Sequence, residues 1–460
     1  MKKLLILAAL ATFLSGCATR SSGVSTQVSK RIEDRAGHGL NPNPQASSFA
    51  IPPGVSLDDG LSEDEAVAIA LWNNAAFQAD LTALGFARAD LIEAGQLRNP
   101  FLTLLLPWGP KQLEATANLP IEVFWQRPRR VAAAKVEVER VAESLTQTGL
   151  NLVRDVRVAY AEQALADERA RIAAQAVNQR NEIAQIVDAR LRAGDISDLE
   201  TSAARLDARR AEEQAARFNA EAALAADRLR FMLGIPAGEK AFNITAAAAQ
   251  VLTTPASPYQ SVAISNIAQR ESTVDVNELI KQALAARPDL RAAELAIEAA
   301  AKRAKWERSK ILSLSAILDA NAKGSKGFEA GPGVQVELPI FNRNRGGITR
   351  AEAEIERAAR QYVAVRHRIA LEVEEAVTQL HQARASLGSY RTQILPRIEE
   401  DILISQKAYA AGEVPYLFVL ETSRQITDAR LREAEASAAL QRATAQLERA
   451  VGGKISETPR

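Results

Sequence analysis

The histidines are the first residues to consider for metal chemistry, and their spacing argues against it. The chain has three, His38, His367 and His381, together with one cysteine and two methionines. His367 and His381 lie fourteen positions apart in one predicted helix, a separation of about 21 Å. Side chains that far apart cannot bind one ion, so the sequence predicts no tight metal site and no cofactor.

Catalytic groups are also missing. The sequence contains no glycine-rich phosphate-binding loop and no arrangement of a nucleophile with a general base. Its 57 basic and 56 acidic side chains nearly cancel, which gives no indication of a nucleic-acid surface. We therefore expect a protein that is not an enzyme and does not bind nucleic acid.

The single cysteine, Cys17, follows a segment that resembles a bacterial lipoprotein signal. Two lysines precede residues 4–14, an apolar run too short to span a bilayer. The run leads into the sequence LSGC at 14–17, so we expect cleavage after residue 16 and acylation of the Cys17 sulfur by fatty acids such as palmitate. An ordinary secretory signal with an unrelated cysteine is the alternative. Ala18 at the next position resembles sorting to the outer membrane of Gram-negative bacteria.

The remainder of the chain is a duplicated unit. Gly194 and Gly412 are 218 positions apart, as are Gly234 and Gly452, and similar sequences surround each pair. A constant offset over this length indicates two similar units packed around a shared axis. The predicted organisation is a signal peptide (1–16), an acylated tether (17–60), a first repeat (61–234), an equatorial connector (235–274), a second repeat (275–453) and a tail (454–460).

Each repeat is predicted to contain a helix, a β-hairpin and a long helical hairpin. Capping patterns begin helices at 61–97 and 275–309. Alternating apolar and polar residues predict β-hairpins at 100–125 and 311–341, although residues 101–106 are apolar on both faces. Apolar residues in steps of three, four and seven then predict coiled-coil hairpins at 128–233 and 345–451. Within these hairpins, Gly194 and Gly412 are expected to form left-handed helix caps, and Pro396 to break its helix near Leu395.

The predicted strands have one apolar and one polar face, but one chain has too few of them to enclose a pore. Four strands leave open edges, which lipid does not tolerate. No later run of eighteen apolar residues is available for a transmembrane helix. The predicted fold class is therefore mainly α with a small membrane β part. We expect three chains to form a 12-stranded β-barrel above a periplasmic α-helical barrel.

The lipoprotein signal, the duplicated unit and the paired glycines together resemble the TolC family of outer membrane factors. The resemblance covers residues 61–453. It implies a homotrimeric duct in the outer membrane, which joins an inner-membrane pump through a periplasmic adaptor, or membrane fusion protein. The sequence LPIFNRNR at 338–345 is most similar to the heavy-metal-efflux, CzcC-like branch, although drug-efflux members are close relatives.

The resemblance also implies two sites. The turns of the helical hairpins are similar to the ends that dock the adaptor, although their glycines also serve simply to end helices. Glu421 follows Gly412 by nine positions, where many members carry an acid near the periplasmic constriction. Three such carboxylates in a trimer would repel one another and hold cations; a solvated surface charge is the alternative. The predicted docking residues are Arg190, Leu191, Gly194, Asp195, Ile196, Tyr409, Gly412, Glu413 and Val414.

We therefore predict the outer membrane channel component of a tripartite efflux system, which exports metal cations or drugs. The alternative is a structural periplasmic coiled-coil lipoprotein without a pore, which leaves the four amphipathic strands without a role. The sequence does not decide the cargo, because the pump is a separate protein.

Overall fold

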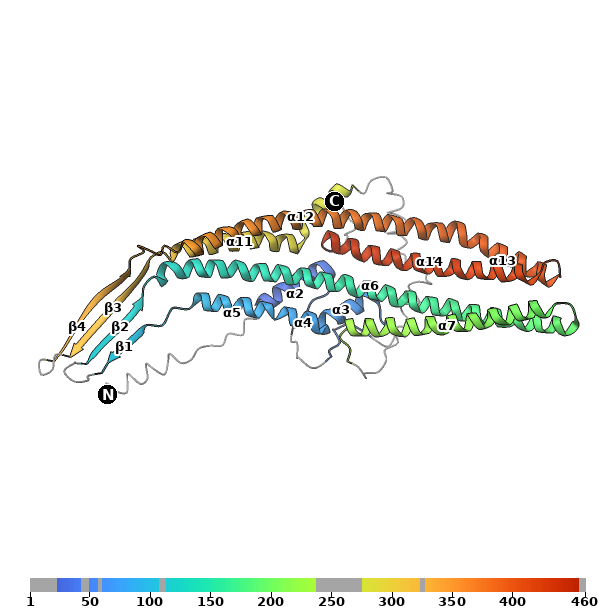
Figure 1. Ribbon diagram of the computed structural model, residues 1–460, viewed down its shortest axis with the longest axis horizontal. Coiled ribbons are helices and arrows are strands. Elements are labelled where there is room, and N and C mark those ends of the chain that lie inside the picture. The colour runs from blue at the N-terminus through green and yellow to red at the C-terminus, as the bar shows by residue number, and fades with distance from the viewer. Residues whose placement is uncertain are drawn as a thin grey trace.

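The computed structural model describes residues 23–42, 49–56, 60–106, 113–236, 275–322 and 327–454. The chain is elongated, with its strands at one end and the turns of two helical hairpins at the other (Figure 1). The predicted signal peptide, Cys17, most of the connector and tail residues 455–460 lie outside the described residues.

The strands form one antiparallel sheet in the order β1 (Phe101–Leu105), β2 (Glu114–Pro120), β3 (Ser313–Ala322) and β4 (Phe328–Glu337). The pairing of β2 with β3 joins the two repeats. Its register places Leu102 opposite Ala117, Ala117 opposite Leu318, and Leu318 opposite Pro332. Side chains alternate between the faces of a sheet, so these residues belong to one continuous apolar face.

The opposite face of the sheet is mainly polar, although it also carries Phe101, Leu105 and Ile317. The Thr116 hydroxyl donates a hydrogen bond to Asp319 Oδ1 at 2.8 Å, and Asn118 Nδ2 donates to Gln335 Oε1 at 3.0 Å. Both bonds cross between the repeats. The sheet therefore has one apolar and one polar face, as the alternation in the sequence predicts.

Two long helical hairpins make up most of the molecule. The first is α6 (Val123–Ala193) with α7 (Asp198–Met232). The second is α12 (Arg345–Ser389), a π-helical segment η2 (Tyr390–Ile394), α13 (Leu395–Ala410) and α14 (Tyr416–Val451). At 71 residues, α6 is about 107 Å long. The predicted break near Leu395 is confirmed, because α13 begins there and carries Pro396 in its first turn.

The expected extent of the first β-hairpin is wrong. Residues up to Trp125 were expected to be extended, but β2 ends at Pro120 and α6 begins at Val123. Glu122 explains the turn, because its backbone N–H donates to Leu314 O and its carboxylate accepts from Leu314 N at 2.9 Å. The chain is thereby tied to β3 at the residue before the helix starts, so alternation beyond Pro120 does not indicate a strand.

The helices that precede each sheet hairpin are broken, whereas single helices at 61–97 and 275–309 were expected. The first repeat has α3 (Glu63–Asn73), α4 (Ala75–Leu81) and α5 (Ala83–Gly95), and the second has α10 (Val276–Ala286) and α11 (Pro288–Ser309). Asn74 and Arg287, both extended, separate the first two helices of each repeat. Pro288 accounts for the second break, because proline disfavours helical geometry in the residue before it.

The two breaks are equivalent positions of the duplication. Asn74 Nδ2 donates to Met232 O at 2.9 Å, and Arg287 Nη1 donates to Ala450 O at 3.3 Å. In each repeat the break therefore contacts the last turn of the helical hairpin. Asn74 also accepts from Phe77 N at 2.9 Å and so caps α4.

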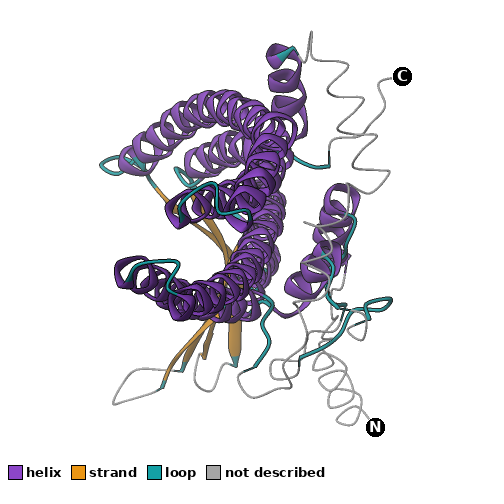
Figure 2. Cartoon of the chain, turned by 90° about the vertical axis from the view of Figure 1, so that its right-hand side faces the viewer, coloured by secondary structure: helices purple, strands orange, loops and turns teal. Residues whose placement is uncertain are grey.

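The prediction of an extended tether is wrong for residues 23–36, which form α2 (Gly23–Ala36). Val28 and Ile32 of α2 are fully buried in the main core, which also contains residues of α3 and α6. Gly149 of α6 makes room for it, since a Cβ atom there would lie 2.6 Å from Ile32 Cδ1. Viewed along its length, the molecule is an open arc of long helices with shorter helices against the convex side (Figure 2).

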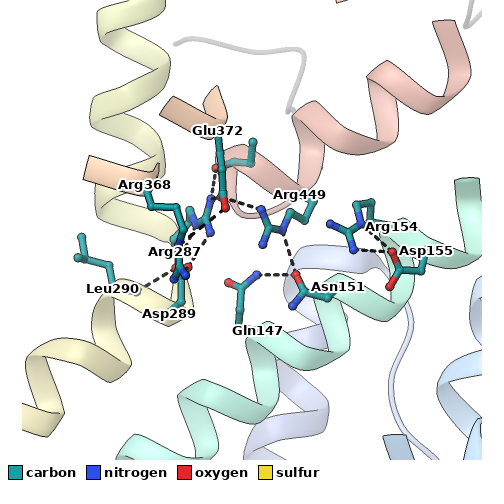
Figure 3. Close-up of polar contacts among 11 residues, drawn as sticks. Gln147, Asn151, Arg154, Asp155, Arg287, Asp289, Leu290, Arg368, Glu372 and Arg449 are labelled. Carbon is teal, nitrogen blue, oxygen red and sulfur yellow. Dashed lines mark hydrogen bonds and ion pairs between the residues drawn. The ribbon is translucent and has the colours of Figure 1, made fainter. Parts of the chain in front are cut away.

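A buried ionic network joins the repeats near the middle of the molecule (Figure 3). The Arg287 side chain is 0% exposed and binds both oxygens of Asp289, at 3.0 and 2.6 Å, as well as Glu372. Glu372 also accepts from Arg449 Nη1 at 2.6 Å, and Arg449 Nε donates to Asn151 of α6 at 2.9 Å. Burial opposes the charge on Arg287, but its hydrogen bonds and the charges of the two carboxylates raise its pKa above the usual value.

Candidate functional site

The ends of the two helical hairpins, which we call the tips (residues 190–197 and 409–416), turn on equivalent glycines. Gly194 has φ +82° and Gly412 has φ +77°, in the left-handed region that glycine tolerates best. Asp195 N donates to Arg190 O at 3.0 Å, and Glu413 N donates to Ala408 O at 2.9 Å. These bonds define the same left-handed cap at both tips and confirm the predicted helix ends.

The structure brings some of the predicted tip residues together. Arg190 Nη2 donates to Tyr409 O at 3.1 Å, and its guanidinium carbon lies 4.4 Å from the centre of the Tyr409 ring. Ile196 and Val414 pack against the same small core, which contains Tyr409, Tyr416 and Val187. The two tips therefore contact each other within one chain.

The other predicted tip residues lie on the surface. Gly194, Asp195, Gly412 and Glu413 are exposed, and Leu191 is partly buried. A Cβ atom at either glycine would contact nothing within 4 Å. The exposed turns thus have room for a partner, whereas Arg190, Tyr409, Ile196 and Val414 hold the tips to each other.

An ion triad behind the tips, with Asp207 and Arg180 buried and Arg424 partly exposed, was not predicted. Asp207 of α7 is 2% exposed, and its carboxylate lies 3.2 Å from Arg180 Nε of α6 and 2.7 Å from Arg424 Nη2 of α14. It therefore ties the first helical hairpin to the second. No sequence pattern singles it out, because Asp207 and Arg424 are 217 positions apart.

Burial next to this triad affects Tyr416 at the start of α14. Burial, with the nearby negative charge of Asp207 as a second cause, raises the pKa of the Tyr416 hydroxyl to about 12. The phenol is therefore neutral at physiological pH. Its ring lies 6.2 Å from that of Tyr409, at an angle of 60°.

Glu421 lies on α14, five residues after Tyr416, and its side chain is exposed. Its Oε1 accepts a hydrogen bond from Gln425 Nε2 at 3.1 Å. Within the described residues it forms no ion pair, in contrast to Asp207. The carboxylate is thus free to face solvent or another copy of the chain.

The polar face of the sheet carries negative charge. Glu114 pairs with Asn321, Asp319 with Gly331, and Ser313 with Glu337, and the four described strands contain no lysine or arginine. Rings of carboxylates attract cations. The acidic residues of the strands are Glu114, Asp319, Glu329 and Glu337.

The histidines lie apart from these features. His367 and His381 are exposed on α12, and His38 lies 3.9 Å from Asp64. Burial lowers the pKa of His38 below its ordinary value, against the opposing charge of Asp64. Among the described residues, no three His, Cys, Asp or Glu side chains are arranged to hold a metal ion.

The helices of the described segments include none with an apolar stretch that could cross a bilayer.

The architecture is that of outer membrane channel proteins. CusC, whose structures concern transmembrane channel formation, aligns over 90% of this chain and 97% of its own, with a TM-score of 0.68 and 19% identity. The outer membrane protein VceC of Vibrio cholerae aligns over 85% of this chain and 96% of its own, with a TM-score of 0.67 and 19% identity. These likenesses establish the fold.

The chain belongs to the outer membrane efflux protein family, which it matches over residues 110–235 and 279–453. The two matched segments correspond to the two repeats. The cobalt-zinc-cadmium resistance protein CzcC of Cupriavidus metallidurans is 26% identical over 384 residues, which cover 81% of this chain and 85% of CzcC. The resemblance predicted from the lipoprotein signal and the duplication is confirmed.

Proposed function

We propose that the protein is the outer membrane duct of a tripartite efflux system, acting as a homotrimer with a lipid on Cys17. The observation that carries this proposal is the four-stranded sheet with one apolar and one polar face, in a chain that belongs to an efflux family. β1 and β4 are open edges, which three copies would close into a barrel of twelve strands. The apolar face would then contact lipid, and the polar face would line the pore.

The proposed cargo is metal cations. The polar face of the sheet carries four carboxylates and no basic residue in the described strands. Three copies around one axis would make a strongly negative lumen, which favours cations over anions. The likeness to a cobalt-zinc-cadmium resistance protein supports the same choice.

The test is to purify the full-length lipoprotein, determine its mass by sedimentation equilibrium, and record currents in planar bilayers under a KCl gradient. We expect trimers whose reversal potential shows a preference for cations. A monomer without conductance, even after the Glu421 change described next, would instead support the structural lipoprotein without a pore. Anion-selective trimers would contradict the proposed cargo.

Replacing Glu421 with alanine is expected to raise the conductance of the resting channel. We place the three copies of this exposed side chain around the periplasmic constriction, where cations bound between the carboxylates offset their mutual repulsion and hold the ring narrow. Removing them should raise the current by about twofold or more and reduce cation selectivity. Glu400→Ala, which removes an exposed carboxylate of α13 paired with Arg397 at 3.1 Å, is the control. Equal currents in both variants would remove Glu421 from the gate.

Replacing Gly412 with leucine is expected to weaken docking of the periplasmic adaptor while the trimer remains intact. The new side chain meets no atom within 4 Å, but positive φ strains a non-glycine residue by about 1–2 kcal/mol. It would also cover the exposed turn. Cross-linking in cells to the periplasmic adaptor measures docking, and Gly388→Leu, at an open helical position of α12, is the control. Loss of the trimer would show that the glycine serves folding instead.

A further inference from the structure

A basic hollow of about 500 Å³ lies where the sheet passes into the helices, away from the tips. It is lined by Trp125, Pro128, Arg129 and Ala132 of α6 and by Lys302 and Lys305 of α11. We infer that this hollow binds the phosphate of an anionic phospholipid headgroup in the membrane leaflet that faces the periplasm. The inference rests on the proposed placement of the sheet in the outer membrane.

The charges of the hollow are available for an anion. Lys302 pairs with Glu298 at 2.8 Å, but Arg129 and Lys305 form neither an ion pair nor a side-chain hydrogen bond with any described residue. Other cations at this level are engaged: Arg127 Nε donates to Gly95 O at 2.6 Å, and Arg130 Nε to Ala94 O at 2.9 Å. Two free cations in one recess therefore complement a phosphate rather than a neutral group.

The hollow opens on the outer side of the helical arc. Pro128 and Ala132 begin a stripe of α6 that continues, in steps of three, four and seven, to Ala142 and Gly149. Gly149 lies beneath Ile32 of α2, and shorter helices cover the convex side of the arc (Figure 2). The hollow thus faces away from the concave side that would form the lumen.

Its neighbours are those expected at a membrane surface. Phe124 is 76% exposed and Phe341 100% exposed, next to the ends of β2 and β4. Trp125 lines the hollow itself. Tryptophan is enriched where headgroups meet acyl chains, and basic pockets at that depth bind anionic headgroups. A phospholipid would place its phosphate against Arg129 and Lys305 and its glycerol against the indole.

The test uses full-length protein in which Trp125 is the only tryptophan, the other three of the four being replaced by phenylalanine. Quenching of its fluorescence by brominated phosphatidylglycerol is compared with quenching by brominated phosphatidylcholine in reconstituted vesicles. We expect phosphatidylglycerol to be preferred by about fivefold for each free cation. Arg129→Gln and Lys305→Gln should each reduce the preference by that factor, and Arg129→Lys should largely restore it. Native mass spectrometry of the wild-type protein, which counts bound phosphatidylglycerol, checks the result without the tryptophan changes.

Arg308→Gln is the matched control, because Arg308 is a cation of the same helix that pairs with Glu352 at 2.8 Å and does not line the hollow. An equal loss of preference in this variant would mean diffuse surface attraction and would overturn the inference. Equal binding of the two lipids by the wild-type protein would also overturn it. Relief of quenching by inorganic phosphate would show a site for a soluble anion instead of a lipid. Conductance of the same preparations separates the proposed duct from the proposed lipid site. Conducting trimers without lipid preference would contradict the lipid site and leave the duct intact.

Discussion

Replacing Arg287 with methionine is expected to destabilise the protein by about 3–5 kcal/mol, the usual cost of leaving buried charges without their partner. The Arg287 side chain is fully buried and supplies two hydrogen bonds to Asp289 and one to Glu372. Methionine fills similar space but leaves Asp289 only with the exposed Arg368, at 3.8 Å, and Glu372 with Arg449 and Arg368. The measurement is the urea-induced unfolding of purified protein at fixed protein and detergent concentrations.

The control for this prediction lies four residues further along the chain, in α11. Arg291 pairs with Glu294 at 2.8 Å, but its side chain is 55% exposed, so Arg291→Met should cost less than about 1 kcal/mol. A second variant tests the cause: Arg287→Met with Asp289→Asn should recover part of the loss, because it removes the carboxylate that has lost its close partner. Equal stability of the Arg287 and Arg291 variants would show that the network contributes little.

Replacing Asp207 with asparagine is expected to loosen the tips and raise the resting current of the channel. The change leaves the Arg180 side chain, 8% exposed, without its counter-charge, a loss of about 3–5 kcal/mol. It also removes the charge that holds Arg424 of the second hairpin at 2.7 Å. Because the triad joins the hairpins, its loss should let them separate, which current recordings and unfolding measurements would both detect.

Asp188→Asn is the comparison for Asp207. Asp188 pairs with Arg205 at 2.9 Å, but both side chains are substantially exposed and belong to one hairpin. Its loss should therefore change stability by less than about 1 kcal/mol and leave the current unaltered. If Asp207→Asn lowers stability without raising the current, the triad serves packing alone. If neither changes, the hairpins are held together by the apolar core around Tyr409 and Tyr416.

The Asp207 triad and the Glu421 carboxylate would act on different contacts of the proposed gate. Asp207 acts within one chain, between α7 and α14, whereas Glu421 has no ion-pair partner among the described residues and would act between copies. A double variant distinguishes the two effects, because independent sites should add while a shared element should not. The tips would then open by separation of the hairpins and by loss of the cations bound between the copies.

Most of the architecture could be predicted from local patterns. Alternation with a period of two located β2, β3 and β4, steps of three and four located the long helices, and glycine after a helix located both tips. These features depend on a residue and its near neighbours, since backbone geometry and the side-chain period are set over a few positions. The duplication further predicted that the two repeats contain equivalent elements. Pro288 was a further local signal, and it marks the break at Arg287 that the expected continuous helix did not include.

The features that only the tertiary structure revealed are contacts of charged side chains and short helices with residues far away in the sequence. The polar composition of residues 23–36 predicts an extended tether, yet Val28 and Ile32 are buried beside α6. Asp207, Arg287 and the cations of the basic hollow resemble ordinary surface charges in the sequence. Their solvent exposure and partners depend on helices that pack together from opposite ends of the chain. The free energy of a charge depends on its surroundings, so the same side chain is nearly neutral to stability on one helix face and essential on another.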